Sequence, residues 1–263
     1  MILKVFICLA VVMLSPVMAK PALAQSGQLY ASGLKAPVGM VYDRQGNLYV
    51  AEWGADRVTR FDRQGKRALA TEAVKSPAGL AFDDAGNLYI ASYAEGAIYC
   101  LDTAGQLRKV AEGLSSPSGL LLTQNKELLV ANRNAGEVLR LLPDGRLEIL
   151  SKGHRTPVGL AQAEDGTIFV SCFGGDVDVI EAAGKKRTVY TGLASPGVGI
   201  IGAGGGILVV DYGKGTVSRV DAKGRGTAVL KGLNSPVGLA RTPDSGLMVG
   251  TWGDEAAFIF NAE

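Results

Sequence analysis

Short apolar runs separated by polar turns recur along this chain with a period of about 40 residues. Each repeat opens with Pro-x-Gly, continues as an apolar run, turns at a glycine, and ends in a second apolar run closed by a polar residue. The prolines are Pro37, Pro77, Pro117, Pro157, Pro196 and Pro236, and the answering glycines are Gly39, Gly79, Gly119, Gly159, Gly199 and Gly238. This spacing indicates a repeat architecture.

The second repeat predicts four strands, over residues 79–83, 88–92, 97–102 and 107–111. Glycine-containing turns at Gly86 and Gly105 join the first strand to the second and the third to the fourth. The apolar residues do not follow helical spacing, which excludes leucine-rich and helical repeats. Four antiparallel strands in one repeat are typical of a β-propeller blade.

The two ends of the chain predict how the ring closes. The last repeat starts at Pro236 and has sequence for only three strands, whereas residues 27–33 resemble the fourth strands at 106–113 and 146–153. We therefore expect residues 27–33 to pair with a strand over 256–261, which removes a free sheet edge. The predicted fold is all-β, a six-bladed β-propeller of four-stranded antiparallel blades closed by the N-terminal strand.

The N-terminus reads as a secretory signal peptide over residues 1–24. A short start with Lys4 precedes an apolar run from Val5 to Leu14, and Ala22-Leu23-Ala24 provides a small-x-small cleavage pattern. The run is too short for a membrane span, which needs about 20 residues. We expect residues 25–263 to form one exported domain, periplasmic in a Gram-negative source and secreted otherwise.

The charge balance disfavours two kinds of partner. The full chain has 27 Lys and Arg against 25 Asp and Glu, and residues 1–24 contain Lys4, Lys20 and no acidic residue. The mature chain is therefore close to neutral, which gives little electrostatic attraction to nucleic acid or to anionic membranes. We expect a monomer that neither binds nucleic acid nor inserts into a membrane.

Two cysteines remain after the signal peptide, Cys100 and Cys172. An oxidising compartment permits a disulfide between them. However, they lie in repeats two and four, which a ring of six blades does not place side by side, and a disulfide needs Cα atoms within about 7 Å. We expect two buried or half-buried free thiols.

Three sequence motifs carry a family resemblance. Pro77–Ala81 (Pro-Ala-Gly-Leu-Ala), Gly46–Ala51 (Gly-Asn-Leu-Tyr-Val-Ala) and Arg57–Asp62 (Arg-Val-Thr-Arg-Phe-Asp) closely resemble NHL repeats. They also resemble the related senescence-marker/gluconolactonase propellers. The resemblance extends over residues 27–263 and implies a propeller with a binding site on its loop-rich channel face, while implying little about activity.

In gluconolactonase-type propellers, the resemblance implies that the x of Pro-x-Gly and its neighbours supply acidic and amide ligands to a divalent metal. In this chain the x positions are Val38, Ala78, Ser118, Val158, Val198 and Val237. A hard cation needs several oxygen ligands, and these residues supply one hydroxyl. This departure argues against lactonase activity.

A second set of positions closes the second strand of each blade: Glu52, Ser92, Asn132, Cys172, Asp211 and Thr251. The oxygens of Glu52, Asn132 and Asp211 come from alternate blades and form a candidate divalent-cation site. The alternative is that each polar side chain caps the turn that follows its own strand. We favour this alternative because every blade has such a residue, and we expect no resident cofactor.

The next residue of each blade forms the candidate ligand-binding set: Trp53, Tyr93, Arg133, Phe173, Tyr212 and Trp252. Five aromatic rings and one arginine on the same face could bind a sugar, a planar ring or a peptide side chain, together with Asn132. The alternative is packing between blades. Arg133 departs most from the repeat and could bind a carboxylate through both arms of its guanidinium.

His154 is the only histidine, and it replaces a leucine found at positions 34, 114, 193 and 233. One histidine cannot build a multi-histidine zinc site, and a catalytic triad would have to use this imidazole. The chain has no Gly-x-Ser-x-Gly motif. We therefore predict a histidine without a catalytic role.

Two functional hypotheses follow. The first is a non-enzymatic exported propeller that binds a protein, a peptide or a small molecule on its loop-rich face. The second is a gluconolactonase-like, metal-dependent hydrolase with an unusual metal site at Glu52, Asn132 and Asp211. The missing metal ligands and the single histidine favour the first.

Overall fold

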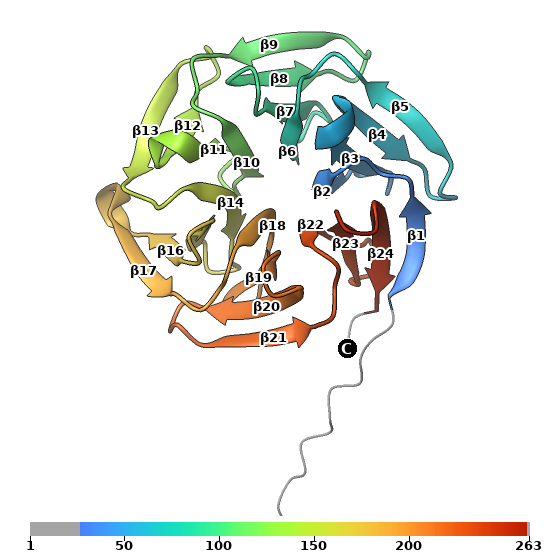
Figure 1. Ribbon diagram of the computed structural model, residues 1–263. Helices are drawn as coiled ribbons and strands as arrows, with labels where there is room; N and C mark the ends of the chain where they lie inside the picture. The colour runs from blue at the N-terminus through green and yellow to red at the C-terminus, as the bar shows by residue number, and fades with distance from the viewer. Residues whose placement is uncertain (1–26, 262–263) are drawn as a thin grey trace, which may run out of the picture.

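The computed structural model describes residues 27–261, which form six four-stranded antiparallel sheets around a central axis (Figure 1). The predicted six-bladed β-propeller is confirmed. The predicted signal peptide, residues 1–24, lies outside the described residues. Within residues 27–261, no helix is long and apolar enough to cross a membrane.

Each blade has its first strand at the axis and its fourth at the circumference. Blades 1 and 2 comprise β2 (Pro37–Tyr42), β3 (Leu48–Glu52), β4 (Arg57–Phe61), β5 (Arg67–Thr71), then β6 (Pro77–Phe82), β7 (Leu88–Ser92), β8 (Ala97–Leu101) and β9 (Leu107–Ala111). Blades 3 and 4 comprise β10 (Pro117–Leu122), β11 (Leu128–Asn132), β12 (Glu137–Leu141), β13 (Leu147–Lys152), then β14 (Pro157–Gln162), β15 (Ile168–Cys172), β16 (Val177–Ile180) and β17 (Lys186–Tyr190). Blades 5 and 6 comprise β18 (Pro196–Ala203), β19 (Gly206–Asp211), β20 (Thr216–Asp221), β21 (Gly226–Leu230), then β22 (Pro236–Arg241), β23 (Leu247–Thr251), β24 (Ala256–Phe260) and β1 (Gln28–Ser32). Three short 3-10 turns are η1 (Trp53–Ala55), η2 (Arg133–Ala135) and η3 (Ala182–Gly184).

The ring closes as the sequence predicts. β1 pairs antiparallel with β24, with Gln28 opposite Ile259 and Ser32 opposite Ala256 (Figure 1). The N-terminal strand therefore becomes the outermost strand of blade 6 and covers an edge that would otherwise be open.

The hydrophobic core is divided into layers between neighbouring blades. One layer joins Leu48 and Val50 of blade 1 to Met248 of blade 6, and another joins Phe169 of blade 4 to Ile207 of blade 5. The remaining interfaces are filled in the same way. This explains the long apolar runs of the second strands, which are buried on both faces. Cys100 and Cys172 are buried in this packing as free thiols, as predicted.

The innermost strands approach one another through the Pro-x-Gly glycines. A Cβ on Gly39 would lie 2.1 Å from the carbonyl oxygen of Ala78, and a Cβ on Gly79 would lie 2.2 Å from that of Ser118. The other four glycines meet atoms of blades 4, 5, 6 and 1 at 2.5–2.7 Å. Only glycine allows backbones this close, so the six glycines set the narrow bore of the propeller.

We expect Gly79→Ala to lower the free energy of unfolding by about 3 kcal/mol, the upper part of the usual range for overpacking, because its Cβ collides with main-chain atoms of the next blade. Gly205→Ala is the matched control, since no atom lies within 4 Å of its Cβ position. Chemical denaturation of both variants tests this. Equal stabilities would show that the blades move apart without cost.

Candidate functional site

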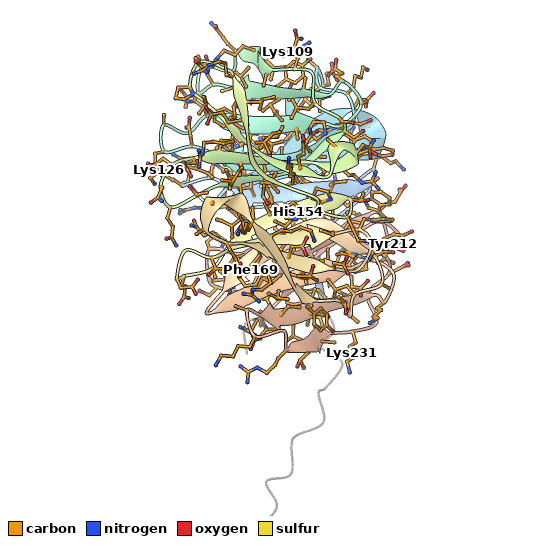
Figure 2. The ribbon with its side chains drawn as sticks, turned by 90° about the vertical axis from the view of Figure 1, so that its left-hand side faces the viewer. Lys109, Lys126, His154, Phe169, Tyr212 and Lys231 are labelled. Atoms are coloured by element: carbon orange, nitrogen blue, oxygen red, sulfur yellow. The ribbon has the colours of Figure 1, made fainter. Side chains whose placement is uncertain are left out.

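A cavity of about 360 Å³ opens at one end of the central channel. We call it the channel-mouth bowl. The x residues of Pro-x-Gly, from Val38 round to Val237, form its apolar floor. Its wall is the predicted ligand-binding set, one residue from each blade: Trp53, Tyr93, Arg133, Phe173, Tyr212 and Trp252. Pro196 and Gly197 complete the lining. The side view places Tyr212 on this face of the disc and Lys126 on the opposite face (Figure 2).

Backbone hydrogen bonds hold the wall residues in place. The N–H of Trp53 donates to the carbonyl of Ala36 at 3.1 Å, and that of Tyr93 donates to Ser76 at 3.1 Å. Phe173, Tyr212 and Trp252 make the same bond to the residue before the proline of their own blade. The loop that enters each blade and the loop after its second strand are therefore tied together, and a wall side chain is presented over the floor.

Five of the six residues that precede these prolines have a left-handed backbone although none is glycine: Ala36, Ser76, Ser116, Thr156 and Ser235, with φ between 43° and 60°. Such conformations cost energy and concentrate at ligand-binding sites. Blade 5 differs, because Gly197 adds one residue after the proline. The same left-handed conformation is thus repeated around the rim of the bowl, where the backbone hydrogen bonds to the wall residues hold it.

The wall residues contact one another around most of the ring. The rings of Trp53 and Trp252 stack at 6.1 Å, with Tyr93 edge-on to Trp53 and Tyr212 edge-on to Trp252. The Arg133 guanidinium carbon lies 5.8 Å from the Tyr93 ring centre and 5.3 Å from that of Phe173. Among the described residues, no ring contact joins Phe173 to Tyr212. The series of ring contacts is therefore interrupted between blades 4 and 5, beside Gly197.

The sequence left two interpretations of these aromatic residues, a ligand-binding surface and packing between blades. The structure places Trp53, Phe173 and Tyr212 on the surface, each about two-fifths exposed. Trp252 and Tyr93 pack partly on the floor, and Trp252 donates its indole N–H to the carbonyl of Pro37 at 3.0 Å. All six face one cavity, while ligand binding by them stays a prediction.

Arg133 is the only charged residue that lines the bowl. One of its terminal nitrogens, Nη1, donates to the Tyr93 hydroxyl at 3.0 Å and to the side-chain oxygen of Asn134 at 3.3 Å. Within residues 27–261, Arg133 forms no ion pair, and its Nε and Nη2 have no acceptor. By contrast, three carboxylates of the surrounding loops are paired, Glu255 with Lys35, Asp56 with Lys75 and Asp176 with Arg155.

Glu52, a predicted metal ligand, is fully buried in an ion pair of its own blade. Its carboxylate accepts hydrogen bonds from Arg57, from the Thr59 hydroxyl and, at 2.8 Å, from the backbone N–H of Lys35. Burial alone would raise the pKa of Glu52, but these donors outweigh it and the pKa lies below its ordinary value. The carboxylate is therefore ionised and its oxygens are occupied.

Asn132 and Asp211, the other two predicted ligands, hold loops in the same way. Asn132 accepts the N–H of Ser115 at 2.7 Å and donates to Glu137 at 3.2 Å. Asp211 accepts the N–H groups of Ala194 and Ser195 at 2.9 and 3.0 Å. None of the three lines the bowl. Their hydrogen bonds lie within their own blades and disfavour a shared cation site. They run mainly to the loop that enters the blade, however, and not to the following turn as the alternative expected.

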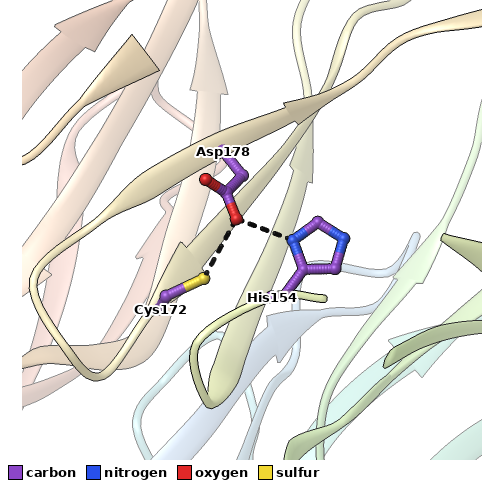
Figure 3. A group of neighbouring side chains, drawn as sticks. All are labelled: His154, Cys172 and Asp178. Atoms are coloured by element: carbon purple, nitrogen blue, oxygen red, sulfur yellow. Dashed lines mark hydrogen bonds and ion pairs between the residues drawn. The ribbon is translucent and has the colours of Figure 1, made fainter. Parts of the chain in front are cut away.

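His154 belongs to a buried polar network that the sequence analysis did not find (Figure 3). Its Nδ1 lies 2.8 Å from Oδ2 of Asp178, and its Nε2 lies 3.0 Å from the Ser151 hydroxyl. The Cys172 thiol donates to the same Asp178 oxygen at 3.6 Å, and Thr188 donates to the other at 2.6 Å. His154 comes from the loop after β13, whereas Asp178 lies on β16, so the network joins blades 3 and 4.

This order of Ser, His and Asp is that of a catalytic triad, but burial separates it from any substrate. Ser151, His154 and Asp178 are 2%, 4% and 1% exposed, and none lines the bowl. Burial, with the nearby carboxylates, also raises the pKa of the Cys172 thiol well above its usual range, so it is not a reactive thiolate. The network is a buried link between blades 3 and 4.

His154, Cys172 and Asp178 also present ligand atoms within 4.8 Å of one another, the one such group among the described His, Cys, Asp and Glu residues. The Lys186 ammonium, 3.6 Å from Asp178, already neutralises the carboxylate and would repel a metal ion. Two signals in the sequence pointed to the network: His154 at a position that is otherwise leucine, and the charged Asp178 between the apolar Val177 and Val179.

The comparisons with known proteins find similarity to gluconolactonase-like propellers. Residues 19–94 match a family model described as the SMP-30/gluconolactonase/LRE-like region. This match confirms the predicted resemblance over that part of the chain, to which the NHL repeat is a near relative. No curated protein matches the sequence.

Solved structures resemble almost the whole described chain. A gluconolactonase from Xanthomonas campestris aligns with a TM-score of 0.76 and 18% identity over 89% of this chain and 88% of its own. A calcium-binding regucalcin from Agrobacterium tumefaciens aligns with 0.74 and 18% over 89% and 93%. A catalytically inactive virginiamycin B lyase from Staphylococcus aureus, solved with quinupristin, aligns with 0.67 and 14% over 90% and 87%. At these identities the likeness shows the fold.

We expect Asp178→Asn to lower the free energy of unfolding at neutral pH by about 3 kcal/mol, because it removes the charged partner of a buried network. Burial alone would raise the pKa of Asp178, but the hydrogen bonds from His154 and Thr188 and the charge of Lys186 hold it below its ordinary value.

This depressed pKa sets the pH dependence of the effect. Asp178 stabilises the fold above its unfolded-state pKa of about 4, and this contribution is lost as the pH falls through the lower, folded-state pKa. The free energies of unfolding of the wild type and Asp178→Asn, measured by denaturation between pH 2 and pH 7, should therefore converge at the acid end. Asp144→Asn, at an exposed turn, is the control. A constant difference across this range would contradict the assignment.

Proposed function

We propose that the protein acts through the channel-mouth bowl, where it takes a small molecule with a largely apolar ring. The observation that carries this proposal is the convergence of one wall residue from each of six blades on a single apolar cavity. Its volume of about 360 Å³ lies at the small end of the range for ligand pockets, about 300–1,000 Å³. Exposed aromatic rings in a concave site gain free energy when a ligand removes them from water.

The comparisons favour the second hypothesis, a gluconolactonase-type hydrolase, over a binding protein without activity. The family match over residues 19–94 and the similarity to a gluconolactonase support it. Hydrolysis of a lactone adds water across the ring ester and yields a hydroxy acid. In the bowl, Arg133 is the residue that could stabilise negative charge on the carbonyl oxygen or on the carboxylate product.

A divalent metal does not fit the residues of the bowl. The floor supplies one hydroxyl, that of Ser118, and it already donates to the carbonyls of Pro157 and Val158 at 3.3 and 3.1 Å. None of the lining residues is a carboxylate, and Arg133 places a positive charge there. Hard cations require several oxygen ligands. We therefore assign no step at the bowl to a metal, and the polar residues at the ends of the second strands remain loop anchors.

The binding wall leads to the first test. We expect Trp252→Ala to reduce lactone hydrolysis or ligand affinity at least about tenfold, because it removes a stacked ring and its share of buried apolar area. A panel of aliphatic and aromatic lactones, followed by acid release, measures hydrolysis, and calorimetry with the same compounds measures binding. Lys126→Ala on the opposite face is the control. Full activity of Trp252→Ala would place the site elsewhere.

The metal-independent bowl leads to the second test. We expect EDTA, Ca²⁺ and Zn²⁺ to leave the melting temperature unchanged, because the carboxylate oxygens of Glu52 are occupied within its own blade. Glu52→Ala should lower the free energy of unfolding by about 3 kcal/mol, with or without these ions, since it leaves the Arg57 charge without its partner. A metal-dependent melting temperature that Glu52→Ala abolishes would instead support the cation site.

A further inference from the structure

We infer that the channel-mouth bowl selects planar apolar molecules that carry one carboxylate, and that Arg133 is the residue that selects the carboxylate. The inference rests on the proposed function of the bowl and names its ligand class. Neither the family match nor the similar structures assign a role to Arg133.

The charge of the bowl is the first argument. Arg133 is its single charged lining residue. Three carboxylates of the neighbouring loops, Glu255, Asp56 and Asp176, are paired with Lys35, Lys75 and Arg155, and among the described residues no carboxylate lines the bowl. A half-buried cation at an apolar cavity favours an anion. Because the rest of the lining is almost entirely apolar, a ligand with several charges would leave all but one without a partner. One negative charge therefore matches the site.

The geometry of Arg133 is the second argument. Its guanidinium packs against the rings of Tyr93 and Phe173 on neighbouring blades, and the Tyr93 hydroxyl and Asn134 accept from Nη1 only. These contacts hold the planar group while Nε and Nη2 keep their protons free of protein acceptors in the described chain. Adjacent Nε–H and Nη2–H groups match the two oxygens of a carboxylate.

The opposite wall is the third argument. In a ring of six blades, Arg133 of blade 3 faces Trp252 of blade 6, which stacks on Trp53 with an angle of 23° between the ring planes. A ligand held at Arg133 by its carboxylate would extend across the apolar floor toward this pair. A flat ring buries apolar area there without the conformational cost that a flexible chain would carry.

The two tryptophans of the chain, Trp53 and Trp252, both lie in the wall of the bowl. Tryptophan fluorescence therefore reports on this site alone. The probes are 2-naphthoate and its neutral counterpart 2-naphthamide, which share the ring and differ in charge. Calorimetry gives the affinity, and fluorescence shows that the probe is in the bowl.

We expect the wild type to bind 2-naphthoate at least about tenfold more tightly than 2-naphthamide. Arg133→Gln should abolish this preference, with naphthoate affinity reduced roughly ten- to a hundredfold and naphthamide affinity nearly unchanged. Arg133→Lys should recover only part of the lost naphthoate affinity, because an ammonium keeps the charge but lacks the paired N–H donors of a guanidinium. Arg155→Gln, which removes an arginine of the same face that is paired with Asp176, is the matched control.

The outcomes separate the inference from the proposed function. If both probes quench the tryptophans with equal affinity, the bowl binds apolar rings and the carboxylate selectivity is wrong. If neither probe binds, both the ligand class and the proposed use of the bowl are wrong. If Arg133→Gln alters folding, the naphthoate preference of the wild type still decides the inference, because that comparison needs no substitution.

Discussion

The close approach of six glycine backbones around the axis is the constraint on which the rest of the molecule depends. At each Pro-x-Gly, a Cβ would fall within 2.1–2.7 Å of a neighbouring atom, mostly main chain of the next blade. The inner strands can therefore come close enough for the x side chains to meet over the axis. The result is a floor of small apolar residues at one end of the channel, instead of an open bore.

That floor decides where chemistry can take place. The residues at the ends of the second strands are directed into their own blades, where Glu52, Asn132 and Asp211 anchor entry loops. In five blades the next residue is carried over the floor by a backbone hydrogen bond to the entry loop, and in blade 3 the N–H of Asn134, one residue later, makes the bond to this loop. The last residue of the second strand is thus a polar group that stabilises the blade, and the residue after it presents its side chain to the bowl. The repeat therefore produces an apolar bowl, and only a departure from the repeat can give it charge.

Much of the fold and part of the site could be predicted from the sequence, because both follow from periodicity. The six blades, the strands of the second repeat and the pairing of residues 27–33 with the last strand depend on patterns within one repeat or between the chain ends. The alignment of Trp53 with Trp252 follows from the same period. The link among Ser151, His154 and Asp178 could not be predicted in this way. It depends on how β13 of one blade packs against β16 of the next, and the pattern within one repeat does not determine how two blades align.

Blades 1 and 4 show why the buried polar groups are architectural. In blade 1, Glu52 on the second strand bonds the Thr59 hydroxyl on the third, and the fully buried Leu34 fills the loop position. In blade 4, the third strand carries the carboxylate, Asp178, opposite Val170 as Thr59 is opposite Val50. Cys172 takes the place of Glu52, and His154 takes that of Leu34. In each of these two blades, a buried carboxylate has a cation and a hydroxyl beside it. The two blades thus bury a carboxylate in two different ways, and His154 is part of the second arrangement. Arg133 belongs to neither arrangement and forms no ion pair among the described residues, so its charge is available to a ligand.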